Sequence, residues 1–287
     1  MIDQLDLIAA AVLIDNIVFQ GVRKKGHFPG GAGLYAIAGA ALFSENTLLP
    51  MNNNNIPITP VGFITSPFKQ KFAIPRQPNL AKAKGHITLT EQFNDIRVFK
   101  GLEGFSHVWV LFQFHKNSDK GWKPTVKAPR LGGNETLGVF ASRSTHRPNG
   151  IGMSVLKRGG YYKHNGLVQL EVEGLDLLDG TPILDIKPYL PYADICESAT
   201  DKLDDYAPIP NRQVVISEPA RASLTQASMT HSDLETLIVS VLQQDPRPAY
   251  KHKLDDDPKE YRVMLYAYDI YFYVQQGTLV VTQLKAV

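Results

Sequence analysis

The sequence is poor in cysteine and in long apolar runs, and each shortage excludes a class of protein. Cys196 is the one cysteine among 287 residues, so the chain forms no internal disulfide and holds no cysteine-based zinc site. A reducing, cytoplasmic location is therefore expected. No run of 18 apolar residues occurs, so no membrane-spanning helix is expected, and Asp3 and Asp6 ahead of the first apolar run argue against a secretory signal.

Several catalytic motifs are also missing. The sequence has no G-x-S-x-G segment, which would carry the nucleophile of a serine hydrolase, and no H-E-x-x-H segment for zinc. His107 and His115 share one β-rich run, but extended chain would hold them about 27 Å apart, so no metal is expected. Gly31 to Ala36 fits G-x-G-x-x-A, yet neither a preceding strand nor a following acidic residue stands at the required spacing, and a Rossmann site is excluded.

Charge is divided unevenly along the chain, although the formal net charge is only +2. Residues 61–158 carry 16 basic and five acidic side chains, whereas residues 159–287 carry 11 basic and 19 acidic ones. A basic block of this size favours a polyanionic partner such as nucleic acid. A solvated lysine-rich face would have the same composition, and charge alone leaves the two interpretations open.

Composition divides the chain into three regions, 1–55, 56–205 and 206–287. In the first, a strand-like run at 7–14 and a Gly/Ala-rich helix at 30–42 precede four consecutive asparagines between prolines, which indicate a linker. In the second, short β-rich runs alternate with Gly and Pro, which predicts a mainly β domain built as a small β-barrel. These runs cover 61–66, 107–114, 137–142 and 167–175.

The third region changes character. An amphipathic helix, capped near Ser232 or Asp233, is expected to end before Pro246. Two strand-like runs follow at 261–274 and 278–284, and the turn at Gly277 between them predicts a hairpin. The region is therefore expected to form a small α+β domain.

Two loops have the composition of binding segments. Residues 138–154 place Arg143 and Arg147 before a Pro-Asn-Gly turn, where guanidinium groups and backbone amides suit an anion. An exposed basic turn is the alternative. Residues 75–80, PRQPNL, hold two prolines, which pre-organise a loop for binding but also suit a purely structural turn.

Two later segments carry charged groups as well. Residues 245–250, DPRPAY, follow the predicted helix and place Arg247 for a phosphate and Tyr250 for base stacking, with a helix-terminating turn as the alternative. Residues 175–194 contain a tight Asp-Gly turn followed by Asp185 and Lys187. For these two side chains a salt bridge along a strand is preferred to a ligand site.

Six segments in order over residues 58–287 together resemble the TsaA-like family. They are PFKQKFAIPRQPNL, GLEGFSHVWVLFQFHK, GWKPTVKAPRLGG, GVFASRSTHRPNGIGMS, LDLLDGTPILDIKPYLPYAD and DPRPAY. The resemblance implies a compact, non-Rossmann β-barrel that binds S-adenosylmethionine, usually as a homodimer whose sites use both subunits. The tRNA-acting members methylate N6 of threonylcarbamoyladenosine beside the anticodon of threonine tRNA. The same reaction and partner are expected here, because the chain has the additional C-terminal domain.

The resemblance also implies a cofactor site and a substrate site. Residues implied to contact S-adenosylmethionine are Pro75, Arg76, Gln77, His115, Lys116, Arg143, Asp176, Leu177, Leu178 and Asp179. The basic face of the barrel is implied to contact the tRNA, as are Asp245, Arg247 and Tyr250 in the C-terminal domain. Asp245 is the expected acceptor of the N6 proton. Positioning is expected to matter more than acid–base strength, because a sulfonium methyl is already electrophilic.

Two features depart from the family pattern. Gly150 stands where the family usually has proline in R-P-N-P-I-G, which is expected to loosen the turn and weaken cofactor binding. Residues 1–55 are foreign to the family; they faintly resemble the start of a ribokinase-type sugar kinase, but are too few for that fold, so no kinase activity is expected. A non-catalytic barrel that binds S-adenosylmethionine or RNA, and a small-molecule methyltransferase, are kept as alternatives.

Overall fold

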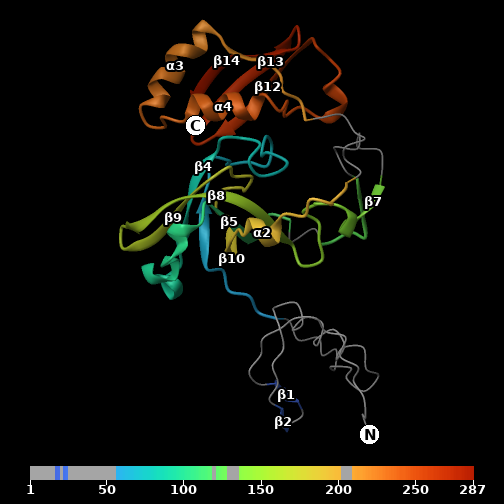
Figure 1. Cartoon of the computed structure of the whole chain (residues 1–287). Helices are drawn as coiled ribbons and strands as arrows, with labels where there is room; N and C mark the ends of the chain where they lie inside the picture. The colour runs from blue at the N-terminus through green and yellow to red at the C-terminus, as the bar shows by residue number, and fades with distance from the viewer. Residues whose placement is uncertain (1–16, 20–21, 25–55, 118–120, 128–135, 202–208) are drawn as a thin grey trace. The chain divides into compact units, whose positions relative to one another are not determined.

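The computed structural model describes residues 17–19, 22–24, 56–117, 121–127, 136–201 and 209–287 (Figure 1). The chain divides into two compact units, Met1–Pro57 and Ile58–Val287. In the first unit, two short antiparallel strands are described, β1 (Ile17–Phe19) and β2 (Val22–Lys24). The strand predicted at 7–14 and the helix predicted at 30–42 lie outside the described residues.

The central region forms a closed β-barrel, which confirms the predicted fold class. Its neighbouring strands are all antiparallel and follow the order β10-β3-β4-β9-β8-β5. The strands are β3 (Gly62–Thr65), β4 (Lys84–Leu89), β5 (His107–Gln113), β8 (Ile151–His164), β9 (Leu167–Glu173) and β10 (Pro182–Pro188). Closure pairs every strand on both sides, so the barrel has no free edge.

Alternation of side chains along the strands builds the barrel core. In β5, Val108, Val110 and Phe112 are buried, whereas the residues between them point to the outer face. Burying each such side chain stabilises the fold by about 1.5–3 kcal/mol relative to exposure. The period-two pattern of the sequence therefore fixes which face of each strand turns inward.

Short elements connect the barrel strands. Three 3-10 turns lie between β4 and β5, namely η1 (Glu91–Phe93), η2 (Ile96–Phe99) and η3 (Leu102–Gly104). Strands β6 (Thr125–Lys127) and β7 (Thr136–Gly138) form a separate two-stranded sheet, and α2 (Pro191–Asp194) follows the barrel.

Two predictions about these connections have clear outcomes. The strand predicted at 137–142 is wrong beyond Gly138, where the chain turns into the 3-10 turn η6 (Val139–Ala141). That turn is closed by the Ser142 hydroxyl and amide, which both donate to the carbonyl of Val139. The predicted salt bridge between Asp185 and Lys187 is confirmed, with 2.9 Å between the charged groups.

The C-terminal region is an α+β domain in which two helices lie on one face of a four-stranded sheet (Figure 1). Its helical elements are α3 (Glu218–Ser228), α4 (Leu234–Leu242) and the 3-10 turn η8 (Ala249–Lys251). Its strands are β11 (Val214–Ile216), β12 (Asp257–Leu265), β13 (Tyr268–Gln275) and β14 (Thr278–Ala286), in the order β11-β14-β13-β12. Among the described residues, no helix is long and apolar enough to cross a membrane.

The predicted helix is confirmed as α4, which has Asp233 as its N-cap and ends before Pro246. Two features of this domain differ from prediction. A further helix, α3, precedes α4 and is separated from it by a polar turn around His231. The single strand predicted at 261–274 is a hairpin of β12 and β13. Its turn is held by Tyr266, which adopts a φ of 53°, stacks on His231 and donates its hydroxyl to Asp233. The hairpin predicted at Gly277 is confirmed by the antiparallel pairing of β13 and β14.

The barrel and the C-terminal domain pack against each other. Phe68, which is fully buried, forms a β-bridge with Leu265, and the Tyr266 amide donates to the Pro67 carbonyl at 2.8 Å. The Ser240 hydroxyl in α4 accepts from the Lys82 amide at 3.0 Å. Helix α4 therefore anchors the segment that leads from the PRQPNL loop into β4.

Candidate active site

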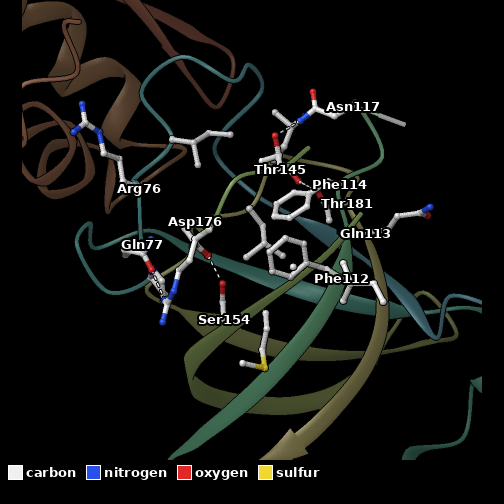
Figure 2. A pocket seen from close by; sticks show the side chains of 18 of the residues that line it. Arg76, Gln77, Phe112, Gln113, Phe114, Asn117, Thr145, Ser154, Asp176 and Thr181 are labelled. Atoms are coloured by element: carbon white, nitrogen blue, oxygen red, sulfur yellow. Dashed lines mark hydrogen bonds between the residues drawn. The ribbon is translucent and has the colours of Figure 1, made fainter. Parts of the chain in front are cut away.

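A cavity of about 670 Å³ opens at one side of the barrel, where five chain segments meet (Figure 2). The segments are the PRQPNL loop, the end of β5, the loop after η6, the start of β8 and the turn after β9. Nine of the ten residues predicted for the cofactor line this cavity: Pro75, Arg76, Gln77, His115, Lys116, Arg143, Asp176, Leu177 and Leu178. Their role as cofactor contacts stays a prediction, but the fold brings them to one place.

The PRQPNL loop is fixed to the barrel by Asn79. This residue has a φ of 64°, its amide donates to the Gly174 carbonyl at 2.9 Å, and its side-chain Nδ2 donates to the Val155 carbonyl at 3.1 Å. A Cβ on Gly174 would lie 2.1 Å from Asn79 Oδ1, so glycine is required at that close approach. The loop is thereby tied to both β8 and the end of β9.

The two arginines of the loop after η6 have different partners. Arg143 Nη1 donates to Gln77 Oε1 at 2.5 Å across the cavity. Arg147 Nη1 instead donates to the carbonyls of Ser142 and Val139, at 2.6 and 3.3 Å, so it holds its own loop together. Of the two predicted clamps, Arg143 is therefore the one that reaches another segment of the cavity wall.

Gly150 adopts a left-handed conformation with a φ of 59°, and a Cβ added to it would meet no atom within 4 Å. A proline ring fixes φ near −65°, so proline cannot take this conformation. Residue 150 therefore adopts a backbone conformation that proline, the usual residue of the family at this position, cannot adopt. Whether cofactor binding weakens as a result stays a prediction.

Asp176 contributes the one carboxylate on the cavity wall among the described residues. Its Oδ1 accepts a hydrogen bond from the Ser154 hydroxyl at 2.8 Å (Figure 2). Burial raises the pKa of Asp176 to about 6, against the opposing effects of the Ser154 hydrogen bond and the positive charge of Arg143. A carboxylate with so little compensation is suited to a cationic ligand.

Aromatic side chains that sequence analysis missed form another part of the wall. The rings of Phe112 and Phe114 pack edge to face, with centroids 5.3 Å apart (Figure 2). A Cβ on Gly152 would lie 2.4 Å from the Phe112 ring, so glycine at this position makes room for the rings. The alternating F-Q-F at the end of β5 was the available signal for this apolar surface.

His115 and Lys116 follow directly after β5 and also line the cavity. Burial lowers the pKa of His115, and the charges of Lys116 and Lys71 lower it further. The Lys116 carbonyl accepts from Lys71 Nζ at 3.0 Å. A hydrogen bond to the Gln113 backbone opposes this shift in the pKa of His115, and the lowered pKa favours the neutral imidazole.

Asp179 lies behind the cavity wall instead of on it. Its Oδ1 accepts from the Ser66 amide at 2.8 Å and its Oδ2 pairs with Lys69 Nζ at 2.7 Å. The Ser66 hydroxyl donates to the Leu177 carbonyl at 2.7 Å. The carboxylate of Asp179 therefore holds the turn that carries Asp176, and its expected contact with the cofactor stays a prediction.

The DPRPAY segment is folded around a buried ion-pair network. Asp245 and Arg247 are 1% and 0% exposed, and two Arg247 nitrogens donate to the Asp245 carboxylate at 2.7 and 2.8 Å. Arg212 Nε donates to the same carboxylate at 2.9 Å, and Arg247 Nη1 reaches Asp257 at 3.3 Å. Burial alone would raise the pKa of Asp245, but Arg247, His252 and Arg212 outweigh it and lower the pKa.

This geometry changes the expected roles of the segment. With both oxygens of Asp245 engaged by arginines, the carboxylate is a poor proton acceptor, and Arg247 is not exposed for a phosphate. Tyr250, in contrast, is 68% exposed in η8. None of the three residues lines the cavity within the described chain. The segment therefore presents Tyr250 on a scaffold held by Asp245 and Arg247.

Comparisons with known proteins agree with this arrangement of two domains. The family model "tRNA-methyltransferase O N-terminal domain" matches residues 63–195, and "TrmO C-terminal domain" matches residues 210–287. The tRNA (adenine(37)-N6)-methyltransferase of Escherichia coli K12 is 44% identical over 211 residues, which cover 73% of this chain and 89% of that protein. A Pseudomonas aeruginosa protein with the provisional name S-adenosylmethionine-dependent methyltransferase RcsF is 44% identical over 78% of this chain and 94% of its own length.

A solved structure shows the same fold. The crystal structure of TrmO from Pseudomonas aeruginosa aligns with a TM-score of 0.66 and 39% identity, and the alignment covers 82% of this chain and 98% of that one. Both family models fall within the unit that contains the barrel and the C-terminal domain. The chain therefore belongs to the tRNA-methyltransferase O (TrmO) family.

Proposed function

We propose that this chain is a methyltransferase that moves a methyl group from S-adenosylmethionine to N6 of threonylcarbamoyladenosine at position 37 of threonine tRNA. Support for the coarser activity comes from relatives named tRNA (adenine(37)-N6)-methyltransferases, including those of Escherichia coli and mouse. The observation that carries the proposal is the barrel cavity, which is lined by nine of the ten residues expected to contact the cofactor, with the Asp176 carboxylate among them.

The cavity fits the charge and the ring system of S-adenosylmethionine. Asp176 matches a cationic centre, Arg143 matches the carboxylate of the methionine portion, and Phe112 and Phe114 offer an apolar surface to the remainder. Pro75, Arg76 and Gln77, together with His115 and Lys116, complete the wall, and Asp179 holds the turn of residues 176–178 from behind. When bound, the cofactor supplies a methyl group activated by a sulfonium.

The remaining task of the protein is to hold the adenine N6 in line with that methyl group and to remove one proton. The lone pair of N6 is delocalised, so orientation contributes most of the rate. We assign the N6 proton to the Asp176 carboxylate, because it is the one carboxylate on the cavity wall within the described residues. This assignment replaces Asp245.

Tyr250 is proposed to stack on a base of the anticodon loop, since it is exposed and aromatic. It does not line the cavity of its own chain. A homodimer, in which one copy presents Tyr250 to the cavity of the other, is therefore part of the proposal. The reaction is placed in the cytoplasm, where its tRNA partner is found.

The test is a single-turnover assay with the purified chain, S-adenosylmethionine and threonine tRNA. Mass spectrometry of the digested nucleosides should show one added methyl group on threonylcarbamoyladenosine, and equal activity on tRNA that lacks the threonylcarbamoyl group would refute the substrate assignment. Release of S-adenosylhomocysteine separates an enzyme from a non-catalytic binder. A KM that does not change with salt would favour a small-molecule acceptor, because RNA binding weakens steeply with salt.

A further inference from the structure

We propose that a lysine-lined groove continuing from the cofactor cavity binds the phosphate backbone of single-stranded RNA next to the target nucleotide. The proposal rests on the proposed function, since it assumes that the target nucleotide enters the cavity. It adds a binding site on the barrel wall, whose four lysines belong to the basic block of residues 61–158 but to neither the cofactor residues nor the DPRPAY segment implied by the family resemblance.

The groove consists of two adjoining hollows between the barrel and the start of α4. Their volumes are about 520 and 670 Å³, and they share Lys84 and Glu173 on the barrel side and Ser232 and Asp233 on the helix side. We call the pair the lysine groove. Its lysines are Lys69, Lys82, Lys84 and Lys157.

Strand β8 leads from the cofactor cavity into the lysine groove. Met153 and Val155 line the cavity, Lys157 lines the first hollow and Gly159 lines the second. At the rise of an extended strand, Val155 and Lys157 lie about 7 Å apart. Asn79, which donates to the Val155 carbonyl, stands at the boundary and lines the first hollow. A chain bound in the cavity therefore reaches the groove within a short distance.

The lysines nearest the cavity are held in place but remain open to solvent. Lys84, Glu173 and Lys157 are directly opposite one another on β4, β9 and β8, with Lys–Glu distances of 3.7 and 3.0 Å. The two lysine side chains are 59% and 58% exposed. The Glu173 carboxylate thus holds the ammonium groups of Lys84 and Lys157 in place, and the three side chains together keep a net positive charge. Such a row of ammonium groups favours RNA binding, because neutralising the phosphates releases the counterions that surround the RNA.

Lys82 adds a further positive charge at the same place. Its backbone amide is tied to Ser240 of α4, while its ammonium group is exposed and makes no ion pair among the described residues. Carboxylates are present as well, since Asp233 lines both hollows and Glu171 lines the second. The second hollow also holds the stacked rings of His231 and Tyr266, with centroids 3.9 Å apart. Cations followed by aromatic rings are the features with which proteins bind single strands, and they favour RNA over an acidic peptide.

The test compares the double variant Lys82→Gln/Lys157→Gln with the wild type and with the control Lys163→Gln, which removes an exposed lysine from the same strand outside the groove. Binding of a labelled anticodon stem-loop RNA is measured without cofactor over a salt series, and S-adenosylmethionine binding is measured separately. Melting curves verify that the variants fold. Arginine in place of glutamine at position 157 keeps the positive charge and should restore the RNA binding that the glutamine removes. About 0.7 counterions are released per phosphate contact on single strands, so the double variant should lower the slope of log K against log salt by about 1.4.

When the salt concentration is raised from about 50 to 200 mM, the RNA affinity of the double variant should therefore fall by a factor about sevenfold smaller than that of the wild type. The control and cofactor binding should be unchanged. A double variant with the wild-type slope would overturn the proposal. The outcome is independent of catalysis, so wild-type protein that binds RNA through the groove but transfers no methyl group would refute the proposed function alone.

Discussion

Two carboxylates differ in how their surroundings compensate the negative charge: Asp176 of the barrel, which is half-buried, and Asp245 of the C-terminal domain, which is buried. Asp176 receives one hydroxyl hydrogen bond from Ser154, and burial raises its pKa to about 6. Asp245 is bonded by Arg212 and Arg247, and its pKa is lowered although burial opposes this. Within the described residues, the first carboxylate forms no salt bridge, and the second forms two. Compensation of charge therefore separates the carboxylate proposed to meet the cofactor from the one that stabilises the C-terminal domain.

The largest effect is expected from Arg247→Ala. Removing this guanidinium leaves the carboxylates of Asp245 and Asp257 buried with less compensation, which should lower the free energy of unfolding by about 3–5 kcal/mol. Urea denaturation followed by circular dichroism measures the change. Arg221→Ala, which breaks an exposed pair with Glu235, is the control and should cost less than about 1 kcal/mol. Similar losses for the two variants would remove the distinction drawn for Asp245.

The second prediction concerns Asp176→Asn, which keeps a hydrogen-bond acceptor for Ser154 and removes the charge. Because the folded-state pKa is raised from 3.8 to about 6, ionisation costs stability as pH rises through that window. At pH 8 the variant should be more stable than the wild type by about 1–3 kcal/mol, and the difference should vanish below about pH 4. Equilibrium denaturation at several pH values checks this.

The same variant should lose function while it gains stability. S-adenosylmethionine binding, measured by calorimetry, should weaken at least about tenfold, because charge-assisted contacts contribute about 1.5–3 kcal/mol. In the wild type, binding should weaken by up to about tenfold per pH unit below pH 6, as the carboxyl of Asp176 takes up its proton. A flat pH profile in the wild type would show that Asp176 is not the group that meets the cofactor.

The smallest effect on stability is expected from Tyr250→Ala. The side chain is mostly exposed, so the melting temperature should stay within about 1 °C of the wild type. Loss of base stacking, about 1–3 kcal/mol, should raise the KM for tRNA by about five- to 150-fold, and Tyr250→Phe should retain most of the activity. Unchanged kinetics in the alanine variant would leave the DPRPAY segment with a purely structural role.

The barrel could be predicted because its strands alternate buried and exposed residues with turns between them. Strand β8 shows the limit, since Gly159 and Gly160 interrupt its pattern although the strand continues to His164. The hairpin at Tyr266 was missed for a different reason. It contains no Gly, Asn or Pro, and it is held by contacts with His231 and Asp233 that lie more than 30 residues earlier in the chain.

The cofactor residues were predicted from family resemblance, not from spacing, because residues as far apart as Gln77 and Asp176 meet only after the barrel closes. The sequence did not indicate which of the predicted site residues are buried. Arg247 was interpreted as a phosphate ligand because an arginine between prolines is typical of a loop. Nothing local indicates that Asp257 pairs with it or that Arg212 shares its partner Asp245. In the sequence, the lysine groove was visible only as the excess of basic residues between positions 61 and 158.

The position of β14 in its sheet has a consequence for protein synthesis. This strand pairs with β13 on one side and runs parallel to β11 on the other, although β11 leaves the ribosome some 60 residues earlier. The four-stranded sheet therefore stays incomplete until residues 278–286 have been translated. A nascent chain released early would complete its barrel but leave β11 without a partner, so an incomplete product would be exposed to proteases before it could act on tRNA.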